Sequence, residues 1–237
     1  MATTLKQTNQ VYQNQRNLFI TNKFDNTALI MDDELVVWTW FRVALTSGAG
    51  AVANGNEALR FRTQSVSAWI SSPWHACAIL WQQLFLVRLG SMAIDYEECV
   101  RLTALSDWTN TYVYRTVGGD VIATAWDYTD WVYFEYDQTV SPNWRICTAD
   151  WWVRTKADSW VPVTTTYTKL WVSVNSAWTS ATFTINWVNV GTITTNIPVW
   201  SGKEFWFMHK IERTAWTSQR QAIKDRVKCL ITYNSWR

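Results

Sequence analysis

Two acidic residues in the middle of the chain have the spacing of a catalytic pair. Glu135 and Asp137 stand two residues apart in a run typical of a β-strand, so their side chains face the same side. Paired carboxylates across a cleft can hydrolyse a glycosidic bond. Glycoside hydrolases built on a jelly-roll fold resemble one another in a strand-borne pattern E-x-D-x-x-E, but its third acid is replaced by Val140 here. The sequence therefore predicts no hydrolase site and favours solvated acids at a strand end.

The other residues that could do chemistry are scattered. His75 and His209 have no nucleophile or metal-binding partner at short spacing. The four cysteines form no C-x-x-C pair, which argues against zinc and a disulfide framework and favours buried free thiols on strands. They are Cys77, Cys99, Cys147 and Cys229. Asp120, Asp127 and Asp130 lack calcium-loop spacing, which leaves calcium binding open. We expect no enzymatic activity and no cofactor.

Aromatic residues could bind a sugar ring by stacking. Four in the second half of the chain could form such a platform: Tyr128, Tyr133, Tyr136 and Trp144. The alternative for the same residues is packing in a core and across strands. The net charge of +2 gives no electrostatic case for nucleic acid or an anionic membrane. No apolar run is long enough for a transmembrane helix, so we expect no membrane insertion.

Strand-length runs of β-branched and aromatic residues recur at intervals of roughly 8–12 residues. The expected strands are Leu35–Val37, Phe41–Leu45, Leu59–Arg62, Thr111–Arg115, Val132–Tyr136, Trp144–Thr148, Leu170–Val174, Thr182–Ile185, Val188–Ile193 and Val227–Tyr233. Residues 47–56 have the composition of a loop, and residues 219–224 are mildly helical. Residues 76–89 are long enough for a helix, although their end at 84–89 is more typical of a buried strand.

These patterns predict an all-β fold, a jelly-roll β-sandwich. The sandwich is expected to occupy residues 31–237 and is best supported over residues 101–237. Residues 1–30 are polar and rich in Asn, Gln and Thr, so we expect an N-terminal arm there.

Tryptophan is in excess and glycine is scarce. The 237 residues include 19 Trp and only 8 Gly, whereas average usage of Gly is about 7%. Asn186-Trp187 joins two alternating runs, where a two-residue hairpin needs positive φ and normally has Asn-Gly. Other tryptophans also stand in polar turns: Trp108, Trp131, Trp151, Trp152, Trp160, Trp178 and Trp216.

We hypothesise that many of these tryptophans are glycines in the protein as its source makes it. The codon UGA specifies glycine in some genetic codes and tryptophan in others. Translation with the wrong table would therefore convert a subset of Gly to Trp. Trp144 lies within an expected strand and is expected to be genuine. The alternative is a protein that truly uses exposed tryptophans to stack on sugars.

With glycine in the turns, a series of segments follows a recurrent order. Residues 130–134 become the strand DGVYF. The later segments are residues 144–149, 155–163, 170–175, 182–187, 194–198, 210–217 and 225–227. In this order the region from Asp130 to Tyr233 resembles the concanavalin A-like, laminin G-like jelly roll of bacteriophage tail, fibre and head-decoration proteins.

The resemblance implies a non-enzymatic structural protein of the virion: a capsid decoration, fibre or tail component. Its partners would be other virion proteins and further copies of itself, in a homo-oligomer assembled in the host cytoplasm, with the N-terminal arm between subunits. An alternative is a lectin-like module that binds a host-surface glycan through the four aromatic residues named above. A glycoside hydrolase would require a carboxylate pair formed in space.

Overall fold

The computed structural model describes residues 20–22, 27–34, 41–46, 50–54, 61–65, 75–81, 92–107, 109–119, 130–151, 153–199, 206–213 and 220–233. Within these ranges the chain forms strands, turns and loops. None of the described segments is a helix that could cross a membrane.

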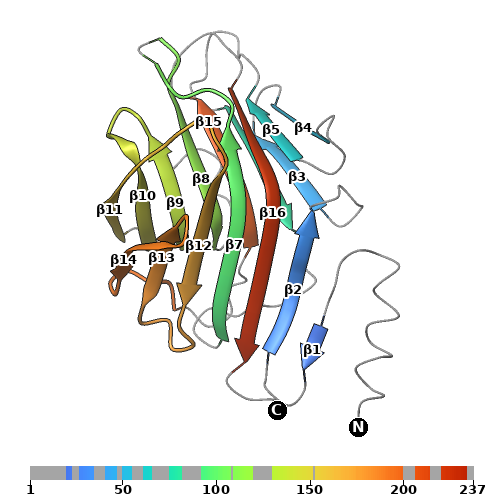
Figure 1. Ribbon diagram of the computed structural model, residues 1–237, viewed down its shortest axis with the longest axis vertical. Coiled ribbons are helices and arrows are strands. Elements are labelled where there is room, and N and C mark those ends of the chain that lie inside the picture. Colours follow the sequence, from blue (N-terminus) through green and yellow to red (C-terminus); the bar gives the residue numbers. More distant parts are fainter. Residues whose placement is uncertain are drawn as a thin grey trace.

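The described strands form two antiparallel sheets, which lie one behind the other in Figure 1. The first, named here the β7 sheet, has the order β1 (Ile20–Asn22), β2 (Thr27–Glu34), β16 (Arg220–Tyr233), β7 (Met92–Leu102), β12 (Thr168–Val174), β13 (Ala181–Ile185) and β14 (Val188–Ile193). Beside it, β5 (Phe61–Ser65) pairs with β16, and β4 (Gly50–Asn54) pairs with β5.

The second sheet, named here the β9 sheet, brings together segments that are distant in sequence. Its order is β11 (Val153–Pro162), β10 (Ser141–Asp150), β9 (Trp131–Asp137), β8 (Tyr112–Gly119), β15 (Trp206–Arg213), β6 (His75–Trp81) and β3 (Phe41–Thr46). Neighbours β8, β15, β6 and β3 are far apart along the chain, as expected of a jelly roll. The all-β jelly-roll prediction is confirmed.

The core lies between the two sheets because alternate residues of each strand point inward. In β12 the side chains of Leu170, Val172 and Val174 are buried, and those between them are half-buried. From the other side, Phe134 of β9 meets Phe183 of β13, with ring centroids 5.2 Å apart at an interplanar angle of 88°. The residues between the inward-facing ones of β9 therefore point away from this core, and Glu135 is one of them.

The structure confirms most of the expected strands and corrects two local predictions. The expected loop at residues 47–56 contains β4, because Val52 and its neighbours pair with β5. The mildly helical residues 219–224 begin β16, where Ala222 pairs with Thr63 of β5 and with Leu102 of β7. Pairing on both edges outweighs the weak local preference of a single segment.

Some predictions concern residues outside the described ranges. These include the strand at residues 35–37 and the strand-like end at residues 84–89. Of the possible helix at residues 76–89, the described part, residues 76–81, belongs to strand β6. Residues 1–19 of the expected arm also lie outside these ranges. Within residues 20–34, β1 and β2 belong to the β7 sheet.

Gly191 in β14 occupies a position that a larger residue would strain. Its φ is +155°, and a Cβ atom there would lie 2.7 Å from Cδ1 of Ile146. We expect Gly191→Ala to lower the free energy of unfolding by about 1–3 kcal/mol, measured by urea denaturation. Val188→Ala on the same strand is the control, because Val188 is exposed and should change stability by less than about 0.5 kcal/mol. Equal stability of the two variants would contradict this prediction.

Candidate functional site

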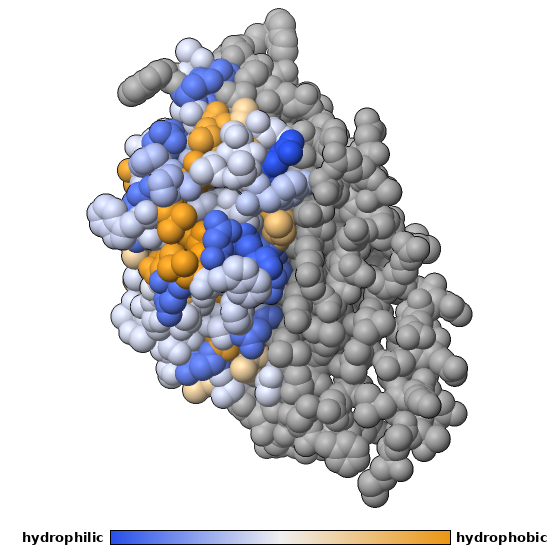
Figure 2. Space-filling model, viewed as in Figure 1, coloured by the Kyte–Doolittle hydropathy of each residue, from blue (hydrophilic) through white to orange (hydrophobic). Residues whose placement is uncertain are grey.

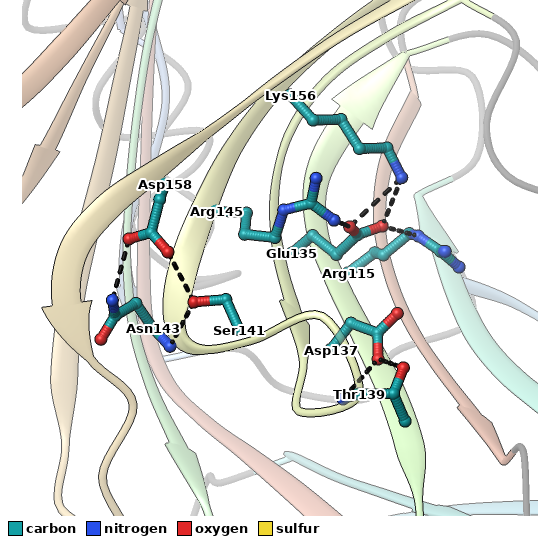
Figure 3. Close-up of polar contacts among 9 residues, drawn as sticks. All are labelled: Arg115, Glu135, Asp137, Thr139, Ser141, Asn143, Arg145, Lys156 and Asp158. Atoms are coloured by element: carbon teal, nitrogen blue, oxygen red, sulfur yellow. Dashed lines mark hydrogen bonds and ion pairs between the residues drawn. The ribbon is translucent and has the colours of Figure 1, made fainter.

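A buried carboxylate on the outer side of the β9 sheet is held by three cationic side chains (Figure 3). Nε of Arg115 lies 2.7 Å from Oε2 of Glu135, and Nη1 of Arg145 lies 3.0 Å from Oε1. Nζ of Lys156 is 2.9 Å from Oε2 and 3.2 Å from Oε1. The Glu135 side chain is 1% exposed. We call these four residues the Glu135 cluster.

The pairing register between neighbouring strands determines the position of the Glu135 cluster. Arg115 of β8 and Arg145 of β10 lie directly opposite Glu135 of β9, one on each side. Lys156 of β11 lies opposite Cys147 of β10, two residues beyond Arg145 and on the same face, so its long side chain reaches diagonally across β10 to Glu135. Side chains opposite one another in a sheet project from the same face. The cluster is therefore built on four adjacent strands of the β9 sheet.

A second polar group, drawn in Figure 3 beside the first, is centred on Asp158 of β11. Its carboxylate accepts hydrogen bonds from the hydroxyl of Ser141 at 2.5 Å and from Nδ2 of Asn143 at 2.9 Å. It also accepts the backbone N–H of Trp160 at 2.6 Å. Asp158 stands opposite Arg145 across β10 and β11, so the two polar groups are neighbours on the sheet.

The second acid of the sequence pair has a different role from Glu135. The carboxylate of Asp137 accepts hydrogen bonds from the backbone N–H and the hydroxyl of Thr139, at 3.1 and 2.6 Å. Its backbone carbonyl accepts the N–H of Val140 at 3.0 Å. Asp137 thus stabilises the turn between β9 and β10. Val140, at the position of the missing third acid, is 60% exposed in that turn.

The environment of Asp158 favours its charged form. Burial raises the pKa of this carboxyl, but the hydrogen bonds from Ser141, Trp160 and Asn143, together with the charge of Arg145, outweigh burial and hold the pKa below its ordinary value. A carboxyl with a lower pKa in the folded state contributes stability above its unfolded pKa of about 3.9, and that contribution is lost as the pH falls through the folded value.

We therefore expect Asp158→Asn to reduce the acid sensitivity of the fold. Between about pH 5 and pH 2 the stability of the parent chain should fall more steeply than that of the variant, because the parent loses an ionised carboxyl that the variant never had. Urea unfolding midpoints at several pH values measure this difference. Parallel pH profiles for the two chains would contradict it.

The structure buries three of the four aromatic residues in the sequence-based platform. Tyr136 and Trp144 lie in the core between the sheets, 0% and 1% exposed, with ring centroids 6.5 Å apart. Tyr133 is 0% exposed, with Nζ of Lys156 5.9 Å from its ring centre. Tyr128 lies outside the described residues. Because a sugar stacks only on an accessible ring face, these buried rings have the packing role that was the alternative.

The remaining candidates do not come together. Cys147 on β10 is buried, as expected, whereas Cys99 on β7 is only half-buried. Among the described residues, His, Cys, Asp and Glu form no group that could hold a metal ion. Asp120 and Asp127 lie outside the described residues. The carboxylate of Asp130 accepts the backbone N–H of Trp151 at 2.7 Å and so supports the turn after β10.

The expectation that Glu135 is a solvated acid at a strand end is wrong, because three cations that were not predicted from the sequence surround its 1% exposed side chain. A signal for two of the cations exists in the expected strands: Arg115 and Arg145, like Glu135, each follow an aromatic residue as the single charge in a strand-length run, whereas Lys156 lies in none of those runs. To infer that these charged side chains form ion pairs, one has to know the pairing register between the strands, which depends on turns and bulges. The shift between Asn143 and Arg145 is such a bulge.

No protein-family model matches this sequence, and no curated protein matches it. Solved structures share its fold. The Lotus tetragonolobus seed lectin superposes with a TM-score of 0.55 at 9% identity, covering 87% of this chain and 99% of the lectin. The carbohydrate recognition domain of Emp47p gives 0.55 at 9% identity, covering 90% and 97%. The endo-β-1,4-glucuronan lyase of the fungus Trichoderma reesei gives 0.55 at 10% identity, covering 84% and 94%.

Proposed function

We propose that this chain is a non-enzymatic glycan-binding module and that its ligand contacts the Glu135 cluster. The fold, a concanavalin A-like jelly roll, is the one found in the lectin and in the carbohydrate recognition domain described above. A shared fold does not define a function, so the proposal depends on the site. The observation that carries it is the polar cluster fixed on the outer side of the β9 sheet.

The cluster has the features that recognition of a hydroxyl-rich ligand requires. Its charged groups are preorganised by ion pairs across four strands, so little ordering is needed on binding. Arg145 and Lys156 have side chains 16% and 19% exposed, so they are the members through which a ligand would make contact. Their N–H groups are strong donors for hydroxyl and carboxylate oxygens.

The geometry also supports a non-enzymatic role. Both oxygens of Glu135 accept hydrogen bonds from cationic groups, and the carboxylate of Asp137 is engaged in its own turn. A catalytic carboxylate has to reach its substrate, whereas the Glu135 side chain is 1% exposed and is engaged by three cationic side chains. We therefore propose binding without turnover of the glycan.

A glycan array probed with the full chain tests this function. Where a glycan binds, Lys156→Gln should weaken it by about tenfold, corresponding to the loss of about 1.4 kcal/mol from one charged hydrogen bond. The matched control is Lys169→Gln on the other sheet, where Lys169 pairs with Glu97 at 3.0 Å. Absence of any binding glycan, or equal effects of the two substitutions, would refute the proposal.

We propose, as a second candidate, that the chain is a structural component of a bacteriophage virion. Its support is the order of segments across residues 130–233, which resembles that of virion jelly rolls. The described part of the face in Figure 2 is mainly hydrophilic with small apolar patches. On β13 and β14 the hydroxyls of Thr182 and Thr192 lie 3.1 Å apart on an uncharged surface suited to contact with another subunit.

Light scattering coupled to size-exclusion chromatography tests this second candidate. A virion component of this kind should form a stable homo-oligomer at micromolar concentration. A chain that remains monomeric at all accessible concentrations would contradict the second candidate and leave the glycan proposal intact.

A further inference from the structure

Four tryptophans have a backbone conformation that L-amino acids with large side chains avoid. Their φ angles are +59° at Trp151, +60° at Trp160, +54° at Trp178 and +71° at Trp187. In this left-handed region the Cβ atom crowds the following carbonyl oxygen, and glycine is the residue that adopts it at no such cost. Asn186 and Asn196 also have positive φ, and asparagine tolerates this region, whereas Val117 has a φ of +112°, far from the values of the four tryptophans.

Each of the four positions belongs to a local structure in which glycine has a specific purpose. Asn186 and Trp187, with φ of +47° and +71°, form the two-residue turn between β13 and β14. Positive φ at both central residues defines a type I′ turn, for which Asn-Gly is the preferred pair. Trp151 begins the two-residue connection between β10 and β11, since Asp150 pairs with Val153.

The other two positions follow the same rule. Trp178 closes the turn between β12 and β13, where its N–H donates to the carbonyl of Asn175 at 2.9 Å. Trp160 lies in an irregular part of β11. Asn143 of β10 pairs with Pro162 and Arg145 pairs with Asp158, so the segment of β11 between the two pairs is longer than the facing segment of β10. Glycine in the left-handed conformation is typical of such bulges.

Trp144 provides the contrast within the same chain. It lies in β10, it is not one of the described residues with a positive φ, and its side chain is 1% exposed in the core. Its ring meets those of Tyr114 and Phe134 at centroid distances of 6.2 and 6.5 Å. Tryptophan fills this site, whereas the indoles of Trp160 and Trp187 are 82% and 66% exposed.

We propose that residues 151, 160, 178 and 187 are glycines in the protein as its source synthesises it, and that the source reads UGA as glycine. Two codons then underlie the printed tryptophans. UGA encodes the four with a left-handed backbone conformation, and UGG encodes Trp144. This inference depends on the backbone angles and on no ligand, so it can be tested independently of the glycan proposal.

With glycine at these positions, fewer aromatic side chains are exposed on the surface. The exposed indoles of Trp151, Trp160 and Trp187 would be absent from the molecule made by its source. So would the contact of Lys169, whose Nζ lies 3.9 Å from the ring centre of Trp187. The described part of the surface then loses its three exposed tryptophans, and recognition of a ligand there has to rely on polar groups.

Peptide mass spectrometry of the protein made by its source tests the inference directly. Trypsin cleaves after Lys169 and next after Lys203, so one peptide contains positions 178 and 187. We expect its fragment masses to assign glycine at both positions and the peptide containing residue 144 to retain tryptophan. The gene should have UGA at 151, 160, 178 and 187 and UGG at 144. Tryptophan masses at 178 and 187, or UGG codons there, would overturn the proposal.

A stability comparison tests the structural argument on the expressed full chain. Trp187→Gly should raise the Tm by about 2–4 °C relative to Trp187→Ala, because both remove the indole and only glycine removes the Cβ. The same comparison at Trp160 should give the same sign. Position 178 is unsuitable because its indole is buried, so its removal also changes packing. Equal Tm values for the Gly and Ala variants at 160 and 187 would overturn the structural argument.

Discussion

Trp144→Ala should lower the free energy of unfolding by about 3–5 kcal/mol, as expected for a fully buried large aromatic side chain. The Trp144 indole is 1% exposed and contacts the rings of Tyr114, Phe134 and Tyr136 at edge-to-face angles. Its removal loses both the transfer free energy of the ring and its contacts with three aromatic neighbours. Urea denaturation followed by circular dichroism measures the change.

Trp160→Ala is the matched control for this experiment, because it removes the same side chain from an 82% exposed position. The control should change the free energy of unfolding by less than about 0.5 kcal/mol. If Trp144→Ala costs no more than Trp160→Ala, the indole is not part of the core and the assignment of Trp144 as a genuine tryptophan loses its support. A large difference supports the assignment of Trp144 as a core residue, in contrast to the exposed Trp160.

The two kinds of tryptophan also show how far sequence analysis could go. The alternating polarity of the flanking runs predicts a hairpin turn at Asn186-Trp187, and the structure has that turn between β13 and β14. The β4 strand was missed because residues 50–54 are small and resemble a loop, and only pairing with β5 makes them a strand. Local signals thus identify turns and strongly patterned strands, whereas weak strands depend on their neighbours.

The candidate site was harder to predict than the fold. Tyr136 and Trp144 suggested a platform because aromatic residues serve both cores and binding surfaces, and composition does not distinguish the two. The roles of these residues depend on which face of β9 points inward. Phe134 and Tyr136 line the core, so Glu135 points away from it. A shift of one residue in register would exchange these faces, and single-sequence reasoning does not fix register that precisely.

The second large effect is expected at Glu135. Glu135→Gln should lower the free energy of unfolding by about 3–5 kcal/mol, because it neutralises one member of a buried charge network and leaves Arg115, Arg145 and Lys156 around an uncharged amide. The matched control is Glu97→Gln, which removes the same charge from a more exposed pair with Lys169 and should cost less than about 1 kcal/mol. Equal costs would contradict the assignment of Glu135 as the centre of the cluster.

A double-mutant cycle separates the network from the individual residue. Arg145→Met combined with Glu135→Gln should cost less than the sum of the two single changes, with a coupling of about 0.5–3 kcal/mol, because the first removes a cation that the second leaves without its carboxylate. Additive costs would mean that the 3.0 Å contact between the two side chains contributes little. Since Glu135 supports the fold as well as the site, a loss of glycan binding in Glu135→Gln would be ambiguous. Lys156, at the more exposed edge of the cluster, is therefore the residue at which binding and stability can be measured apart.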